Sequence, residues 1–219
     1  MSNDFYAINL RLTGRLCLVV GGGSVAARKT AGLLACRAQV RLVSPRLVPA
    51  LVRRAARGEI VWLPRSYQKE DLSGAVLAFA ATDDPAIQEQ VSRDAGEQGI
   101  LVNRADDTPD GDFHLPASLR RGPLLVTIST SGQSPALSAA LRRRLEREFG
   151  DAYAPLTELC GRLRPFFPDR RKLSACTERL LAAGLTELPP ARREIEARRL
   201  LAAMLPADVD VSSLLRGIF

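Results

Sequence analysis

The residues Gly21, Gly23 and Ala26 have the spacing Gly-x-Gly-x-x-Ala and stand between an apolar run and an amphipathic segment. This is the setting of the dinucleotide fingerprint. Gly21 would form the tight turn, Gly23 would let a pyrophosphate approach the backbone, and Ala26 would let a helix pack close to a sheet. The free N–H groups at the helix start, around Ser24 and Val25, would then bind the phosphates. The pattern predicts a dinucleotide cofactor.

The residues after the second predicted strand depart from the usual NAD site. An NAD-binding domain commonly places Asp or Glu there to hold the ribose hydroxyls. Here Ser44 occupies that position, and Pro45 and Arg46 follow it. We predict that Ser44 and Pro45 contact the cofactor, and that the cofactor is NAD with NADP not excluded.

Arg28 and Lys29 add two positive charges to the first turns of a helix whose N-terminus is already positive. This placement is mildly unfavourable, by about a few tenths of a kcal/mol for each charge. An anion close to these side chains would compensate for it. The alternative is that both side chains are solvated on the outer face of the helix.

Two loops follow predicted strands at the edge where parallel α/β sheets bind ligands. Residues 81–85 have the sequence ATDDP and include Thr82 and Asp83, which we expect to contact the cofactor. Residues 103–113 have the sequence NRADDTPDGDF. Each Asp there could be a turn former or a general base. His114, the one histidine of the chain, follows this loop and is a candidate for catalysis or substrate binding because imidazole titrates near neutral pH.

The elements that would position these residues alternate between strands and helices. Strands are predicted over 15–21, 39–45, 59–65, 75–82 and 100–105, and helices over 24–37, 47–58 and 85–99. Uniformly apolar strands separated by helices indicate a parallel sheet covered on both faces. The first domain, residues 1–113, is therefore predicted to be an α/β Rossmann-type doubly wound fold.

The rest of the chain has another pattern. Residues 114–150 contain two short extended segments around Gly122 and Pro123, followed by a helix over 134–150 that Ser134 would cap. We predict a small α+β dimerisation unit here and a C-terminal helical domain over 151–219. Such a strand-and-helix unit needs a surface on which to bury itself, which favours a homodimer.

Net charge and composition limit the partners. The net charge is +7, and residues 117–219 hold 17 basic against 11 acidic residues, compared with 14 against 13 before them. This basic half suits an acidic partner or a small polyanion. Nucleic-acid binding is disfavoured because aromatic residues make up only 5% and none lies among the arginines as a stacking platform. No apolar run is long enough to span a membrane, so we expect a cytoplasmic protein without membrane contact.

Four segments together resemble one family. They are CLVVGGGSVAARKTAGLL, AFAATDDPAIQEQVS, GILVNRADD and DFHLPASLRRGPLLVTISTSGQSPALSAALRRRLE, and they occur in the order found in precorrin-2 dehydrogenase/sirohydrochlorin ferrochelatase, the siroheme synthase module. The similarity runs from about Phe5 to Phe149. It implies NAD-dependent oxidation of precorrin-2 to sirohydrochlorin, followed by insertion of Fe²⁺ to give siroheme. Fe²⁺ would be a substrate, with no stable metal site.

The resemblance also implies roles for single residues. The family motif N-x-x-D falls on Asn103 and Asp106, so Asp106 would be the catalytic base in both steps, with Fe²⁺ passing near it. The substrate carries eight carboxylates. The predicted substrate contacts are Arg28, Lys29, Asn103, Arg120, Arg121, Ser129, Thr130, Ser131 and Ser134. Family members are homodimers, and a separate uroporphyrinogen methyltransferase would supply the substrate.

Two alternatives stay open at this point. The chain could be a dehydrogenase without chelatase activity, since some members of the family are. It could also be a non-catalytic NAD-sensing regulatory domain, which would bind the dinucleotide without turnover. That alternative leaves unexplained the Ser-Gly-Gln-Ser-Pro segment over 131–135 and the basic helix that it begins.

Overall fold

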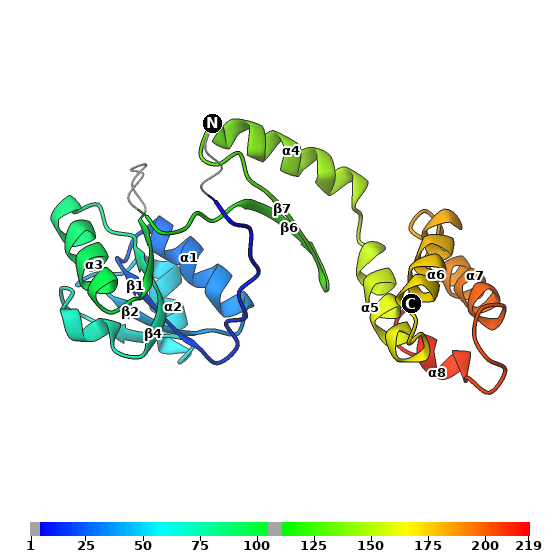
Figure 1. Ribbon diagram of the computed structural model, residues 1–219. Coiled ribbons are helices and arrows are strands. Elements are labelled where there is room, and N and C mark those ends of the chain that lie inside the picture. The colour runs from blue at the N-terminus through cyan, green and yellow to red at the C-terminus, as the bar shows by residue number, and fades with distance from the viewer. Residues whose placement is uncertain (1–4, 105–110) are drawn as a thin grey trace. The chain divides into compact units, whose positions relative to one another are not determined.

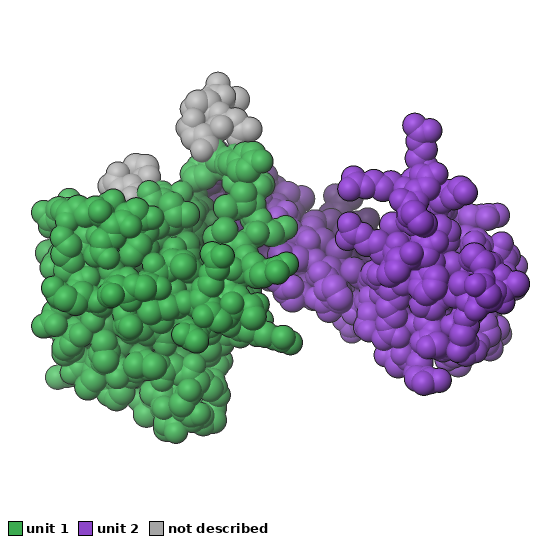
Figure 2. Space-filling model, turned by 60° about the horizontal axis from the view of Figure 1, so that its bottom comes forward, with its two compact units in different colours: residues 1–115 green, residues 116–219 purple. Residues whose placement is uncertain are grey.

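The computed structural model describes residues 5–104 and 111–219, which form two compact units, 1–115 and 116–219 (Figure 2). The predicted end of the dinucleotide domain, at residue 113, lies close to the boundary between the units. The further division at residue 150 stays a prediction. None of the described helices combines the length and apolar character that crossing a bilayer would require.

The first unit contains one parallel sheet in the order β3-β2-β1-β4-β5. Its strands are β1 (Leu16–Val20), β2 (Gln39–Val43), β3 (Val61–Leu63), β4 (Ala75–Ala80) and β5 (Leu101–Arg104). The helices between them are α1 (Ser24–Ala35), α2 (Pro49–Ala56), the 3-10 helix η1 (Lys69–Leu72) and α3 (Pro85–Glu97) (Figure 1). Every predicted strand and helix of this unit is present, and η1 is the element that the sequence pattern did not predict.

Two apolar layers enclose the sheet. On one face, Ala26 and Leu33 of α1 and Leu51 of α2 pack against strand residues such as Val19 and Leu42. On the other face, Val91 and Ala95 of α3 and Leu72 of η1 pack against Leu18 and Ala78. Because both faces are covered, the strands are apolar along their length without alternation. The predicted doubly wound fold is confirmed.

The order of the strands determines where a ligand can bind. From β1 the chain adds β2 and β3 on one side of the sheet. It then crosses back and adds β4 and β5 on the other side of β1. The carboxyl ends of β1 and β4 therefore diverge into loops on either side of a crevice, which is where open α/β sheets bind ligands. The glycine loop leaves β1 at this position, and the ATDDP loop leaves β4.

The second unit begins with an antiparallel pair, β6 (Ala117–Arg121) and β7 (Leu124–Ile128), joined by a turn at Gly122, whose φ is +54°. Helix α4 (Pro135–Glu148) packs against this pair. Ser134 caps α4 by accepting a hydrogen bond from the Leu137 N–H, as predicted. In residues 117–148, only Leu119 and Ser138 are buried within the chain.

The remaining helices form a separate apolar core. They are α5 (Tyr153–Leu163), the 3-10 helix η2 (Arg164–Phe166), α6 (Arg170–Ala182), α7 (Pro190–Ala202) and α8 (Val211–Leu215). Leu159, Leu163, Leu180 and Leu201 are fully buried among them. Pro189 and Pro190 begin α7, and the turn between α6 and α7 is made at Gly184, whose φ is +66°.

Candidate dinucleotide site

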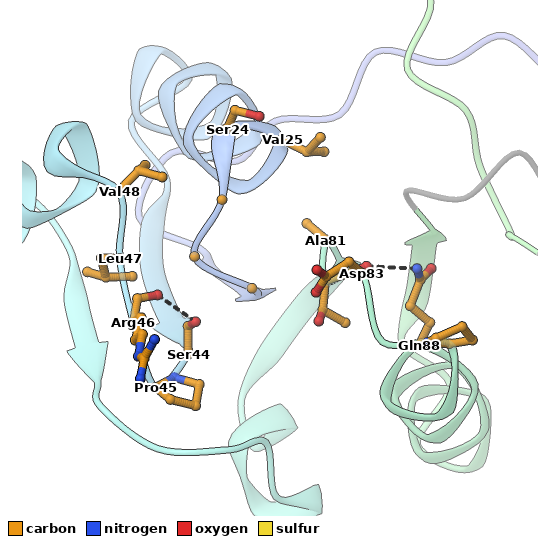
Figure 3. Close-up of a pocket in the computed structure, with 15 residues that line it drawn as sticks. Ser24, Val25, Ser44, Pro45, Arg46, Leu47, Val48, Ala81, Asp83 and Gln88 are labelled. Atoms are coloured by element: carbon orange, nitrogen blue, oxygen red, sulfur yellow. Dashed lines mark hydrogen bonds between the residues drawn. The ribbon is translucent and has the colours of Figure 1, made fainter.

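A pocket of about 960 Å³ opens at the carboxyl ends of β1, β2 and β4. In Figure 3 the glycine loop separates Ser44 and Arg46 on one side from Ala81, Asp83 and Gln88 on the other. The predicted cofactor residues that line it are Gly21, Gly23, Ser24, Val25, Ser44, Pro45, Thr82 and Asp83. Ala26 does not line the pocket. It is fully buried in the layer between α1 and the sheet, where its small side chain allows close packing.

The three glycines of the loop differ in what an added Cβ atom would meet. Gly21 has φ +129°, and a Cβ there would lie 2.2 Å from the Ala81 carbonyl oxygen. A Cβ on Gly22 would lie 1.8 Å from the Arg46 carbonyl oxygen. A Cβ on Gly23 would meet no atom within 4 Å. Gly21 and Gly22 are therefore required by the fold itself, whereas the space beside Gly23 is free for a ligand.

The start of α1 faces this free space. No side chain caps the first N–H groups of the helix or neutralises their partial positive charge. Gly23 is the N-cap and gives no side-chain cap, and the first turn holds no acidic residue. The first N–H groups of a helix lack intrahelical partners and carry the positive end of the helix dipole. This arrangement suits a phosphate or pyrophosphate.

The two sides of the pocket are held by hydrogen bonds within the loops. Ser44 Oγ donates to the Arg46 carbonyl at 2.8 Å, and Trp62 Nε1 donates to the Ser44 carbonyl at 2.9 Å. On the other side, Gln88 Nε2 donates to the Thr82 carbonyl at 2.8 Å. Asp84 caps α3 by accepting from the Ala86 N–H at 2.9 Å. Both walls of the pocket are thus hydrogen-bonded within the protein itself.

Sequence reasoning missed several pocket residues. Gly22, Arg46, Leu47, Val48, Ala81, Pro85 and Gln88 also line it. Gly22 could have been predicted, because it lies between the two glycines of the fingerprint and is itself a glycine. Gln88 gave no signal, because its contact with Thr82 depends on how α3 packs.

The second group of predicted residues lies at the end of β5. Asn103 is 6% exposed, and its Oδ1 accepts a hydrogen bond from Lys29 Nζ at 2.7 Å. Lys29 also lies 5.7 Å from the centre of the Phe79 ring. Burial lowers the pKa of Lys29 below its ordinary value, with a smaller effect from the charge of Arg28. Arg28 itself is exposed.

The loop that follows Asn103 is closed at its base. Asn103 Nδ2 donates to the Phe113 carbonyl at 2.8 Å. The Val102 N–H donates to the Asp112 carboxylate at 2.7 Å, and the Asp112 N–H donates to the Val102 carbonyl at 2.9 Å. Asp106 belongs to the enclosed segment and lies outside the described residues. These bonds hold the two ends of the segment that carries the predicted base.

His114 lies just after these closing bonds. It is exposed, and its ring centre is 4.6 Å from that of Phe5. The structure gives it no hydrogen bond within residues 5–104 and 111–219. Its predicted role in catalysis or substrate binding stays a prediction.

Some of the predicted substrate residues of the second unit are exposed, whereas others already form hydrogen bonds or ion pairs within the protein. Arg120 is exposed, whereas Arg121 donates to the Glu146 carbonyl and pairs with Asp151 at 3.3 Å. Residues 129–134 form a hydroxyl loop, in which Thr130 Oγ1 accepts from the Ser134 N–H and Ser129 Oγ accepts from the Ser131 N–H, both at 3.1 Å. These hydroxyls shape the loop that begins α4.

Two family models match the chain. A model described as putative NAD(P)-binding matches residues 8–117, and one described as the central part of a sirohaem biosynthesis protein matches residues 121–148. The first match covers the unit that contains the pocket. The second covers β7 and α4, and it begins at Arg121, the last residue of β6.

Curated relatives and a solved structure agree with these models. Siroheme synthases of Thioalkalivibrio sulfidiphilus and Azotobacter vinelandii are both 38% identical to the chain, over 94% and 92% of its length. The chain spans only 43% and 44% of these two relatives. The structure of SirC, a precorrin-2 dehydrogenase, matches with a TM-score of 0.71 and 26% identity, over 91% of this chain and 98% of SirC. The chain therefore belongs to the NAD(P)-binding family of precorrin-2 dehydrogenases and siroheme synthase modules.

Proposed function

We propose that this protein oxidises precorrin-2 to sirohydrochlorin and transfers the hydride to a nicotinamide dinucleotide. The observation that carries the proposal is the pocket at the glycine loop, in the same sheet that brings Lys29 and Asn103 together at the end of β5. The likeness to SirC over nearly its whole length supports the same reaction. The macrocycle loses one hydride to the dinucleotide and one proton to a base.

Asp106 is proposed as that base. A carboxylate can accept a proton from a macrocycle carbon if it is held beside the nicotinamide. The closed base of its segment, made by Asn103, Phe113 and the Val102–Asp112 pair, supports this role because it fixes where the segment leaves and rejoins the sheet. The nicotinamide ring, which accepts the hydride, would lie at the carboxyl end of the neighbouring strand, β4.

The carboxylates of the substrate would be met by arginines. Arg28, Arg120, Arg143 and Arg144 are exposed, so their guanidinium groups are available to bind carboxylates in the bidentate manner that arginine favours. Arg142, in contrast, pairs with Glu146 on the same helix. Ser129 and Ser131 of the hydroxyl loop are exposed, so their hydroxyls are available to a ligand.

We further propose that the active form is a homodimer. Leu124, Leu125 and Val126 of β7 remain partly exposed, and Leu137 of α4 is 50% exposed. Leaving this much apolar surface in water is unfavourable, by roughly 25 cal/mol for each Å² that a partner could cover. A second copy of the chain would cover it.

Ferrochelation is proposed as a second activity, with Fe²⁺ and sirohydrochlorin as substrates. Metallation requires two pyrrole protons to leave, and Asp106 could accept protons in this step as well. The names of the siroheme synthase relatives support the proposal. The alternative is a dehydrogenase without chelatase activity, and the assay described next distinguishes the two.

The test is a coupled assay on the full chain. Precorrin-2 is incubated with NAD⁺ or NADP⁺, and the absorbance of sirohydrochlorin is followed. Fe²⁺ or Co²⁺ is then added, and metallation is followed by the change in the same spectrum against a protein-free control. Dinucleotide binding without sirohydrochlorin would overturn the proposed oxidation and favour the sensing alternative. Oxidation without accelerated metallation would remove only the chelatase.

A further inference from the structure

Asp112 is hydrogen-bonded to the backbone of β5 beside the buried residue Val102. Strand β5 stands at the end of the sheet order, next to β4, and Val102 is 3% exposed. The Val102 N–H donates to the Asp112 carboxylate at 2.7 Å, and the Asp112 N–H donates to the Val102 carbonyl at 2.9 Å. Asp112 therefore pairs with Val102 as a residue of a neighbouring strand would, with its side-chain carboxylate in place of a peptide carbonyl.

The residues on both sides of Asp112 also lie against β5. A Cβ atom on Gly111 would lie 3.4 Å from the Arg104 backbone nitrogen. Asn103 Nδ2 donates to the Phe113 carbonyl at 2.8 Å, and Phe113 packs against the apolar layer between the sheet and helices α1 and α2. The chain thus leaves β5 at Arg104 and has returned to the same place by Gly111.

The carboxylate of Asp112 has a partner within the protein. The sequence left open whether an Asp of residues 103–113 forms a turn or acts as a base. A hydrogen bond from a backbone N–H to a carboxylate is charge-assisted, and it is shorter and stronger than one between neutral groups. Because the Asp112 carboxylate makes such a bond to Val102, the geometry favours a role in holding the chain over a role in proton transfer.

We propose that Asp112 is a positioning residue for the oxidation, because its bonds to Val102 determine where the proposed base can reach. Asp106 follows Arg104 by two residues and precedes Asp112 by six, so the chain on either side of it leads to these bonds. A base must lie within hydrogen-bond reach of the proton that it takes, and a displacement of about 1 Å can lower the rate about a hundredfold. Asp112 acts through Asp106 and does not touch the substrate. The inference rests on the proposed function, since it concerns the base of that reaction.

The experiment compares two substitutions of Asp112 in the full-length protein. Asp112→Ala removes the acceptor of the Val102 N–H, whereas Asp112→Asn keeps a side-chain oxygen that can accept it. Steady-state oxidation of precorrin-2 is measured with saturating dinucleotide, and the dinucleotide Kd is measured by calorimetric titration. We expect Asp112→Ala to lower kcat about tenfold or more, with the KM for precorrin-2 and the dinucleotide Kd within about twofold of the parent. Asp112→Asn should recover most of kcat.

Amide hydrogen exchange at Val102, followed by NMR, gives a readout that does not depend on activity. The Val102 N–H should exchange at least about tenfold faster in Asp112→Ala than in the parent, and close to the parent rate in Asp112→Asn. The pH dependence of kcat separates positioning from proton transfer. A lost positioning bond lowers kcat at every pH and leaves the shape of the profile unchanged, whereas a lost base changes the shape.

Asp169→Ala is the matched control. Asp169 is an exposed Asp of the other unit whose carboxylate also accepts a backbone N–H, that of Arg171, at 2.9 Å. The same substitution there removes the same kind of bond and should leave kcat and KM unchanged.

Three results would overturn the inference while the proposed oxidation stands. The first is a parental kcat in Asp112→Ala, or a raised KM with an unchanged kcat. The second is an unchanged exchange rate of the Val102 N–H in that variant. The third is an Asp112→Asn variant that is as slow as Asp112→Ala although its Val102 N–H is still protected, because the carboxylate charge itself would then be required. Absence of oxidation by the parent protein would overturn the proposed function, and the inference with it.

Discussion

Lys29 of α1 donates a hydrogen bond of 2.7 Å to Asn103 at the end of β5, across 74 positions of sequence. The bond joins the helix that follows the glycine loop to the strand that leads into the Asp106 segment. Lys29 is half-buried against Phe79, and Phe79 in turn meets the edge of the Phe113 ring at 5.5 Å. The sequence left open whether Lys29 meets an anion or solvent, whereas the structure shows that it connects α1 with the strand that precedes the proposed base.

The first prediction concerns this bond. Lys29→Met keeps the length of the side chain and removes the donor, which leaves the buried Asn103 Oδ1 without its partner. An unsatisfied buried acceptor costs about 1–3 kcal/mol, so we expect the free energy of unfolding to fall by that amount. Urea denaturation measures it. Arg28→Met, at the adjacent exposed position, should change it by less than about 0.5 kcal/mol. Equal effects of the two substitutions would contradict the assigned role.

The second prediction separates two neighbouring glycines. Gly23→Ala adds a methyl group that meets nothing within 4 Å in the protein, so its stability should stay within about 0.5 kcal/mol of the parent. The same methyl group would occupy the space in which a pyrophosphate approaches, and dinucleotide affinity should fall about tenfold or more. Calorimetric titration and urea denaturation are measured on the same samples.

Gly22→Ala is the counterpart of this variant. Its methyl group would overlap the Arg46 carbonyl, so stability and dinucleotide binding should both be lost. If Gly23→Ala bound the dinucleotide as the parent does, the pyrophosphate would not lie at the glycine loop.

The third prediction concerns Asp106. Asp106→Ala should abolish oxidation of precorrin-2, and any metallation, because the proposed base is removed. Binding of the dinucleotide should remain nearly unchanged, since the pocket is built by the loops after β1, β2 and β4. Asp107→Ala is the matched control on the neighbouring carboxylate. Normal dehydrogenase turnover by Asp106→Ala would exclude Asp106 from the mechanism.

Local patterns were enough to predict the fold and half of the pocket. The ends of strands and helices depend on residues close by in the sequence, such as Pro85 at the start of α3 and Gly58 just after α2. The position of the pocket is then determined by where the parallel strands end. Contacts between distant residues could not be predicted in this way. The need for Gly22 arises from the Arg46 carbonyl, and the partner of Lys29 becomes known only when α1 packs on the sheet and the Lys29 side chain reaches the end of β5. Lys29 was predicted to bind substrate, which stays a prediction, but its internal hydrogen bond was not predicted.

The fourth prediction is a pH dependence that originates at Cys17 in β1. The side chain is fully buried, and burial raises its pKa from 9.0 to about 11, with a smaller effect from Cys36. Between these two values the unfolded chain releases the thiol proton while the folded chain keeps it. The unfolded state then binds fewer protons, so the free energy of unfolding falls as pH rises, by about 2 kcal/mol for this group.

Cys17→Ala isolates this contribution from all other titrating groups. The variant leaves a small cavity beside Val19 and should be less stable than the parent near neutral pH. As the pH rises from about 8 to 11, the parent loses the stability that depends on its protonated thiol and the variant does not. The difference between their free energies of unfolding should therefore shrink by about 2 kcal/mol, as measured by urea denaturation under reducing conditions. A difference that stays constant over this range would show that the Cys17 thiol titrates alike in the folded and unfolded chains.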